Sequence, residues 1–215
     1  MDKTVYILGA GFSAPLGLPV MSNFLEMSKD MYLTNTIRYK DFPKVFESID
    51  KMHKTKSYYS TDLFNIEEIL SILEMRDLCG YSKNRKIFIN YLIDVIEYHT
   101  PTFSRPNSQP ANWYDHMFSS FRDYFWFIAS MFSMQVIGNN MSNLMFELQN
   151  QKSMSYGIIT LNYDLILENI LYYIKSIFNC RNNFLLEKTI NNSLSSSSVY
   201  LSKLHGSIDN RIIIP

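Results

Sequence analysis

Three short segments, far apart in the chain, place small or polar residues where an apolar strand should end. They read Ile-Leu-Gly-Ala-Gly-Phe-Ser-Ala at residues 7–14, Ile-Thr-Leu-Asn-Tyr-Asp at residues 159–164 and Lys-Leu-His-Gly-Ser at residues 203–207. Each begins in, or directly follows, a short run of the kind found in parallel strands. Ligands bind at the carboxyl ends of strands in an open α/β sheet, so the three segments predict one assembled pocket.

The order of strand-like and helix-like segments predicts an α/β fold. We expect a Rossmann-like parallel sheet, with a large helical insertion at about residues 21–155 between the first and second motif strands. The first strand is a short apolar run ended by Gly9, which is typical of a fully buried strand. Strands are expected over residues 4–8, 157–161 and 199–204, and a fourth over residues 211–214.

Helical periodicity is clearest at residues 66–78. Asn65 is suited to cap the start of this helix, Glu68 lies three residues further on, and Gly80 follows the end. Residues 12–17 should turn into a helix, but Pro15 and Pro19 restrict how soon it can begin, and the pattern is helical from Met21 onward. Further helices are expected over residues 85–98, 113–137, 143–148 and 165–177, and loops over residues 100–111 and 191–198.

Composition excludes several classes of function. The 20 basic and 20 acidic residues give a formal net charge of zero, so no basic excess indicates nucleic acid or an anionic membrane as a partner. Cys79 and Cys180 form no Cys-x-x-Cys pair, which indicates neither a zinc ribbon nor a disulfide framework. No signal-peptide pattern or membrane-spanning apolar run is present. The simplest expectation is one cytoplasmic domain over residues 1–215 that holds no metal.

The glycine turn after the first strand has the spacing Gly9-x-Gly11-x-x-Ala14. This is the Ala-ended form of the dinucleotide fingerprint, in which backbone N–H groups approach phosphate oxygens at a helix N-terminus. A purely structural turn would read the same way. An ordinary dehydrogenase is disfavoured, because Glu26 and Asp30 lie in helix-like sequence where the fingerprint needs an acidic residue at a strand end.

Asn162 and Asp164 lie where the second motif strand meets a helix. Asp164 could cap that helix and Asn162 could form an Asx turn, which is the structural alternative. The functional interpretation is that the carboxamide of Asn162 donates to and accepts from a ribose hydroxyl or a water molecule.

His205 differs from the other three histidines because a glycine and a serine follow it at an expected strand end. His53, His99 and His116 lie in helix-like or loop-like sequence and are expected to be surface or packing residues. A histidine at a pocket can act as a general base near neutral pH. The alternative is a histidine that is merely hydrogen-bonded at the sheet edge.

In this order, the Gly-Ala-Gly-x-Ser turn, the Thr-x-Asn-x-Asp element and the His-Gly pair resemble the Sir2 family of NAD-consuming proteins. The branch they resemble most occurs in bacterial antiphage defence, where the domain hydrolyses NAD+. The resemblance implies that Asn162 positions water or a ribose hydroxyl and that His205 acts as general base. It places the other NAD+ contacts at Gly9, Ala10, Gly11, Phe12, Ser13, Thr160, Tyr163, Asp164, Gly206 and Ser207.

The same resemblance carries expectations about products and partners. Nicotinamide and ADP-ribose, or cyclic ADP-ribose, would be released, with the glycine turn holding the pyrophosphate. Because the segments after the His-Gly pair complete the NAD+ site in Sir2 proteins, the chain is expected to be the N-terminal portion of a longer protein. A homo-oligomer is expected, together with a C-terminal sensor domain or a partner defence protein.

Three other interpretations remain open at this stage. A sirtuin-type deacylase would need paired zinc-binding cysteines and a Pro-Asp-Phe-Arg element, whereas residues 19–22 read Pro-Val-Met-Ser. A nucleotide-sensing domain would bind NAD+ or ADP-ribose without cleaving it. A related abortive-infection family opens with Gly-Asn-Gly-Phe-Asp, but Ala10 and Ser13 fit the Sir2-like opening better.

Overall fold

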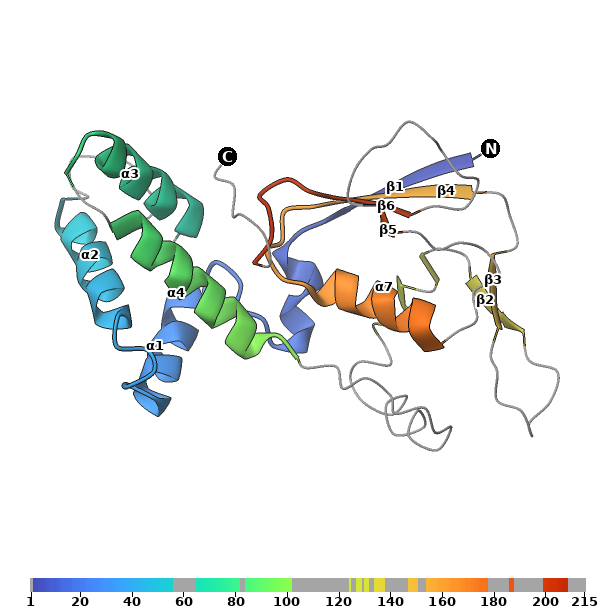
Figure 1. Ribbon diagram of the computed structural model, residues 1–215, viewed down its shortest axis with the longest axis horizontal. Coiled ribbons are helices and arrows are strands. Elements are labelled where there is room, and N and C mark those ends of the chain that lie inside the picture. Colours follow the sequence, from blue (N-terminus) through green and yellow to red (C-terminus); the bar gives the residue numbers. More distant parts are fainter. Residues whose placement is uncertain are drawn as a thin grey trace. The chain divides into compact units, whose positions relative to one another are not determined.

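The computed structural model divides the chain into two compact units, which we call the sheet unit and the helical unit (Figure 1). The sheet unit consists of Met1–Gly9, Pro101–Leu161 and Leu165–Leu204, and the helical unit of Ala10–Thr100, Asn162–Asp164 and His205–Pro215. The structure describes residues 2–55, 65–81, 84–101, 124, 127–128, 130–131, 134–137, 147–150, 154–177, 186–187 and 199–208.

The sheet unit contains a parallel sheet, which confirms the α/β fold class. Its strands lie in the order β1 (Asp2–Leu8), β4 (Met154–Thr160), β6 (Val199–Lys203) and β5 (Leu186–Glu187). All neighbouring pairs are parallel. The three motif strands therefore form where the apolar runs predict them, and the order of the strands in space differs from their order in the sequence.

Helix α7 (Ile166–Ile177) follows β4 directly, as the sequence predicts, and belongs to the same unit (Figure 1). Over residues 166–171 its buried positions form two adjacent pairs four residues apart, which lie on one helix face: Ile166, Leu167, Ile170 and Leu171. Lys203, the last residue of β6, donates from Nζ to Glu168 Oε1 of α7 at 3.0 Å. This contact ties the helix to the carboxyl end of the strand.

Strand β1 is not the fully buried strand that its apolar run predicts. It lies at the edge of the sheet, and the side chains of Val5 and Ile7 are 60% and 76% exposed. Thr4, Tyr6 and Leu8 alternate with them and are half-buried. Side chains alternate between faces along a strand, so one face of β1 is covered while the other remains open to solvent. The apolar composition alone does not distinguish an edge strand from a central one.

The helical unit begins with two short 3₁₀ turns, η1 (Ala10–Phe12) and η2 (Ala14–Leu16). Its described residues then form the helices α1 (Phe24–Thr34), α2 (Phe42–Thr55), α3 (Ile66–Leu78) and α4 (Asn84–His99) (Figure 1). α4 contacts the other three, and Tyr91 lies at the centre of their core. Its ring packs edge-on against Phe42 at a centroid distance of 4.8 Å.

Helix α3 has the bounds that its sequence predicts. Asn65 Oδ1 accepts hydrogen bonds from the backbone N–H groups of Glu67 and Glu68, at 2.9 and 3.4 Å. Gly80 has a φ of 77° beyond the other end, a left-handed conformation that favours glycine. The cap and the glycine together explain why local sequence was sufficient to fix this helix. α4 also matches the expectation to within one residue at each end.

The helix expected over residues 113–137 is confirmed at its described residues 124, 127–128 and 130–131, which are helical. Its last residues, 134–137, and the described end of the helix expected over residues 143–148 are strands instead. These strands, β2 (Met134–Ile137) and β3 (Glu147–Asn150), form an antiparallel pair. A short apolar run has the same composition in a strand and in a buried helix, so its pairing partner decides between them. The expected strand at residues 211–214, the loop at 191–198 and nearly all of the loop at 100–111 lie outside the described residues. Where the chain is described, no helix combines the length and apolar character needed to cross a membrane.

Candidate functional site

The three motif strands end side by side. Leu8 of β1 lies opposite Thr160 of β4, and Thr160 lies opposite Lys203 of β6. The ladder continues one residue further, because Leu161 N donates to Leu8 O at 3.3 Å and Leu204 N to Thr160 O at 3.0 Å. The three segments that follow these strands therefore start next to one another, at the carboxyl ends of the strands.

The residues that follow these strand ends belong to the helical unit. Of the residues that the sequence singles out, Gly9 and Thr160 lie in the sheet unit, at the strand ends themselves. The others share the helical unit: Ala10, Gly11, Phe12, Ser13, Asn162, Tyr163, Asp164, His205, Gly206 and Ser207. Their contacts with one another can therefore be described within one compact body.

The glycine turn leaves its backbone accessible. Gly9, Ala10 and Gly11 are exposed, and neither glycine has a positive φ. A Cβ atom added at Gly9 or Gly11 would meet no atom within 4 Å. Neither the packing nor the backbone conformation of the protein therefore requires glycine at these two positions. Because glycine has no side chain, there is open space in which a ligand group such as a phosphate could approach the main chain.

The helix expected over residues 12–17 is present only as the 3₁₀ turns η1 and η2. The delayed start that the two prolines predict is confirmed, because α1 begins at Phe24. Pro15 lies in the first turn of η2, and Gly17 ends it with a φ of 91°, so the segment cannot extend into an α-helix. A phosphate held at this turn would meet the N–H groups of short 3₁₀ turns, in contrast to the α-helix N-terminus of the ordinary dinucleotide fingerprint.

Asn162 is joined to the glycine turn by its side chain. Its Nδ2 donates to Ser13 Oγ at 3.2 Å, and Ser13 is buried, with only 1% of its surface exposed. Ser13 is itself fixed by backbone bonds, because its N–H donates to Ala10 O and its carbonyl accepts from Leu16 N, both at 3.1 Å. A rigid turn after β1 thus orients the carboxamide that follows β4.

Asp164 is buried just before α7. The helix begins at Ile166, and Leu165 O accepts a helical hydrogen bond from Asn169 N at 2.9 Å. Asp164 therefore lies two residues before the first helical residue, close to where a helix-capping side chain would be, and its role as a cap stays a prediction.

His205 is joined to the residue after Asn162. The rings of His205 and Tyr163 lie 5.9 Å apart between centroids, at an interplanar angle of 40°. A backbone–backbone hydrogen bond also joins the two segments, because Ile208 N donates to Tyr163 O at 3.1 Å. Gly206 has a φ of 78°, so a glycine is needed directly after the histidine for the chain to turn there. Ser207 is buried beside it.

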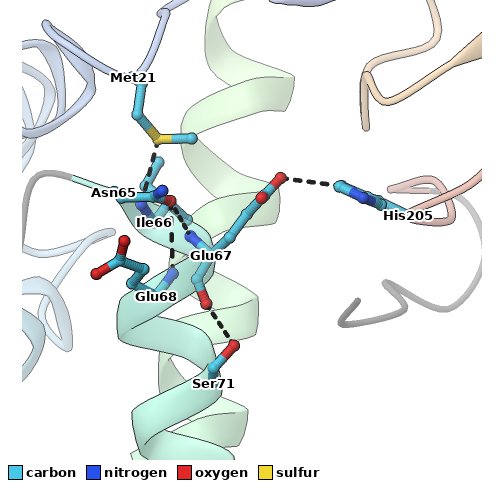
Figure 2. Close-up of polar contacts among 7 residues, drawn as sticks. All are labelled: Met21, Asn65, Ile66, Glu67, Glu68, Ser71 and His205. Carbon is cyan, nitrogen blue, oxygen red and sulfur yellow. Dashed lines mark hydrogen bonds and ion pairs between the residues drawn. The ribbon is translucent and has the colours of Figure 1, made fainter. Parts of the chain in front are cut away.

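Sequence reasoning missed a carboxylate next to His205. Glu67 Oε1 of α3 lies 2.9 Å from His205 Nδ1, as the dashed line in Figure 2 shows. The two atoms are at ion-pair distance but lack the alignment of a hydrogen bond. No signal in the sequence pairs these residues. The one local indication is that Glu67 lies in the first turn of a well-capped helix, which fixes where its side chain starts.

Tyr163 adds a buried hydroxyl to the same cluster. Among the described residues this hydroxyl has no hydrogen-bond partner. Burial, and to a smaller extent the negative charge of Glu67, raise the pKa of Tyr163 to about 12. The hydroxyl therefore keeps its proton at neutral pH and can donate it to an acceptor. Buried polar groups of folded proteins are nearly always satisfied, so a ligand or a water molecule is the natural partner.

The contacts run in series through the predicted site. Ser13 contacts Asn162, the backbone leads on to Tyr163, the Tyr163 ring contacts His205, and His205 contacts Glu67. Over the described ranges, no group of three or more His, Cys, Asp or Glu side chains is arranged as a metal site would require.

In comparisons with known proteins, no family model matches the chain. A search of curated proteins finds no matching relative.

Proposed function

We propose that this chain binds NAD+ and hydrolyses its nicotinamide–ribose bond, and that its fold is Sir2-like. The products would be nicotinamide and ADP-ribose, or cyclic ADP-ribose if a nucleophile of the dinucleotide replaces water. One observation carries the proposal: the three motif segments, which are far apart in sequence, touch each other through Asn162–Ser13 and Tyr163–His205. Neighbouring parallel strands bring any three following segments together, so the support comes from the contacts that their predicted site residues make with one another.

The chemistry of the reaction fits these side chains. In NAD+ the nicotinamide is a cationic ring, and it becomes a neutral molecule when its bond to ribose breaks. The leaving group therefore needs no general acid. The ribose becomes oxocarbenium-like as the bond breaks, and the attacking water or hydroxyl must lose a proton. His205 is a residue type suited to accept that proton near neutral pH. The Nδ2 of Asn162 donates to Ser13 Oγ, and a carboxamide held in this way would offer its oxygen to a water or a ribose hydroxyl.

The glycine turn would supply the pyrophosphate contacts. Its backbone is exposed, and the open space beside Gly9 and Gly11 gives phosphate oxygens access to N–H groups. An alanine at Gly11 would occupy that space without clashing with the protein. Buried Ser13 would act by supporting Asn162 and the turn from within.

The wider biological role is a part of the same proposal that only the sequence resemblance supports. It comprises NAD+ depletion in antiphage defence, a cytoplasmic location, a homo-oligomer and a partner defence protein or sensor domain. A protein that destroys NAD+ must be held inactive until it is needed, which is a reason to expect such partners.

Nicotinamide release from NAD+ by purified protein is the direct test. We expect Asn162→Ala and His205→Ala each to lower the rate by about 100-fold or more, as loss of a positioned acid–base group does. Matched controls are Asn90→Ala, at an exposed position of α4, and His53→Ala in α2, both of which should retain the wild-type rate. Circular dichroism and thermal melting would show that all four variants fold.

Two further results would contradict the proposal that the chain hydrolyses NAD+. Turnover that requires an acetylated peptide would identify a deacylase. Tight NAD+ binding without nicotinamide release would identify a sensing domain. Wild-type activity in Asn162→Ala or His205→Ala would refute the assigned residues.

A further inference from the structure

We propose that Glu67 is a positioning residue for His205, a role that rests on the proposed NAD+ hydrolysis. Glu67 Oε1 lies 2.9 Å from His205 Nδ1, and the histidine side chain is only 11% exposed. Figure 2 shows the two side chains reaching toward one another from α3 and from the segment after β6, while Glu68 points elsewhere. The pair therefore joins the helical insertion to the third motif.

The start of α3 holds Glu67 in a defined place. Its backbone N–H donates to Asn65 Oδ1 at 2.9 Å, and its carbonyl accepts from Ser71 Oγ at 2.8 Å. The preceding residue, Ile66, donates its N–H to Met21 Sδ at 3.2 Å (Figure 2). The N-terminal turn of a helix also favours a carboxylate through the helix dipole. Local structure thus fixes the backbone position from which the side chain of Glu67 reaches His205.

A carboxylate beside Nδ1 selects one tautomer of the neutral imidazole. The hydrogen is favoured on Nδ1, where Glu67 can accept it, and the lone pair of Nε2 is then free to act as the base. In the free protein the two atoms are at the right distance but lack hydrogen-bond alignment. Such contacts commonly tighten when substrate binds, and a small rotation of the imidazole ring would align this one.

The reaction step then balances as follows. An attacking water molecule, or a hydroxyl of the dinucleotide, gives its proton to His205 Nε2 as its oxygen forms a bond to C1′ of the ribose. The bond from C1′ to the nicotinamide nitrogen breaks, and its electron pair leaves with neutral nicotinamide. Glu67 offsets the positive charge on the imidazolium until the proton passes to solvent. No oxidant or further reactant is needed.

The first test compares two glutamates in the same helical turn. Glu67→Ala and Glu68→Ala each remove one negative charge from the first turn of α3, but only Glu67 meets the histidine. We expect Glu67→Ala to lower kcat for nicotinamide release by about 10- to 100-fold with KM changed less than about twofold. Glu68→Ala should keep the wild-type kcat. Equal kcat values for Glu67→Ala and wild type would overturn the proposal.

The second test does not depend on activity. Nitrogen-15 NMR of the His205 ring, in mildly alkaline buffer, distinguishes hydrogen on Nδ1 from hydrogen on Nε2. We expect the Nδ1–H tautomer in the wild type and in Glu67→Gln, whose amide oxygen still accepts, and the Nε2–H tautomer in Glu67→Ala. An Nε2–H tautomer in the wild type would refute the pairing. If the wild type has the Nδ1–H tautomer but releases no nicotinamide, the pairing stands and the proposed hydrolysis fails.

Discussion

Each unit contains an ion pair whose basic partner comes from the segment around the end of β6, and the two pairs are built differently. In the sheet unit, Lys203 donates to Glu168 at 3.0 Å, and the two side chains are 10% and 11% exposed. In the helical unit, His205 lies 2.9 Å from Glu67 without hydrogen-bond alignment, and Glu67 is 31% exposed. A lysine keeps its charge at neutral pH, whereas a histidine gains and loses a proton there. The Lys203–Glu168 pair is therefore suited to stabilising the fold. The His205–Glu67 pair is suited to the proton transfer of the proposed reaction.

Two tyrosines of the helical unit show the same contrast between core and motif. Tyr91 donates to Ser28 Oγ at 2.7 Å, and Ser28 in turn donates to Leu25 O at 2.8 Å, so the chain of donors ends on a carbonyl within the helical core. The hydroxyl of Tyr163 is also buried but lacks a partner in the described part of the protein. The Tyr91 hydroxyl is thus satisfied within the helical core, whereas the Tyr163 hydroxyl of the motif cluster has no hydrogen-bond partner among the described residues.

The largest effect on stability is expected from breaking the pair of the sheet unit. Lys203→Ala leaves the Glu168 carboxylate buried without its cation, and its other oxygen is already without a hydrogen bond. We expect a loss of about 3–5 kcal/mol in the free energy of unfolding, measured by urea denaturation. Replacing both partners, by Lys203→Met with Glu168→Leu, should restore most of it. A loss in Lys203→Ala no larger than that in Glu67→Ala would remove the distinction between the two pairs.

Alkaline pH should reveal the buried tyrosine of the core. Burial raises the pKa of Tyr91 to about 12, from 10.0 in the unfolded chain. Between these values the unfolded chain has lost the proton and the folded protein keeps it, so the stability that Tyr91 contributes is complete below pH 10 and falls as pH rises toward 12. The expected slope for this group is about 1.4 kcal/mol per pH unit.

The measurement is a series of urea denaturations of wild type and Tyr91→Phe across that pH range. Below it the variant should be less stable by about 1 kcal/mol, because it lacks one hydrogen bond. Ser28 still donates to Leu25 O in the variant, so no new unsatisfied group arises. The difference should shrink and then reverse as pH rises. Parallel curves would show that Tyr91 does not carry the raised pKa.

The smallest stability change is expected at Tyr163. Tyr163→Phe removes a buried hydroxyl that has no protein partner among the described residues, so stability should stay the same or rise by up to about 1 kcal/mol. If the hydroxyl serves the proposed site, KM for NAD+ should rise by about 2- to 10-fold, the effect of one lost hydrogen bond. Thermal melting and nicotinamide release measure the two quantities. A clear loss of stability would mean that Tyr163 has a structural partner after all.

The strand ends and the best-capped helix were predictable because their signals are local. The apolar runs of β1, β4 and β6 each stop at the residues where the motifs begin, and Asn65 and Gly80 mark the ends of α3. Residues near in sequence set backbone conformation, cap hydrogen bonds and helical period, so one chain is sufficient to read them. The same local reading fails at β2 and β3, because strand or helix depends there on a pairing partner.

Local patterns along the chain were sufficient to predict the α/β class, the three motif segments and several of the helices around them. Three features became visible in the folded chain alone: β1 lies at the edge of the described strands with Val5 and Ile7 exposed, Ser13 supports Asn162, and Glu67 meets His205. These features depend on residues far apart in the chain. Folding brings them together through packing, and no spacing or period in the sequence records which side chains will then touch.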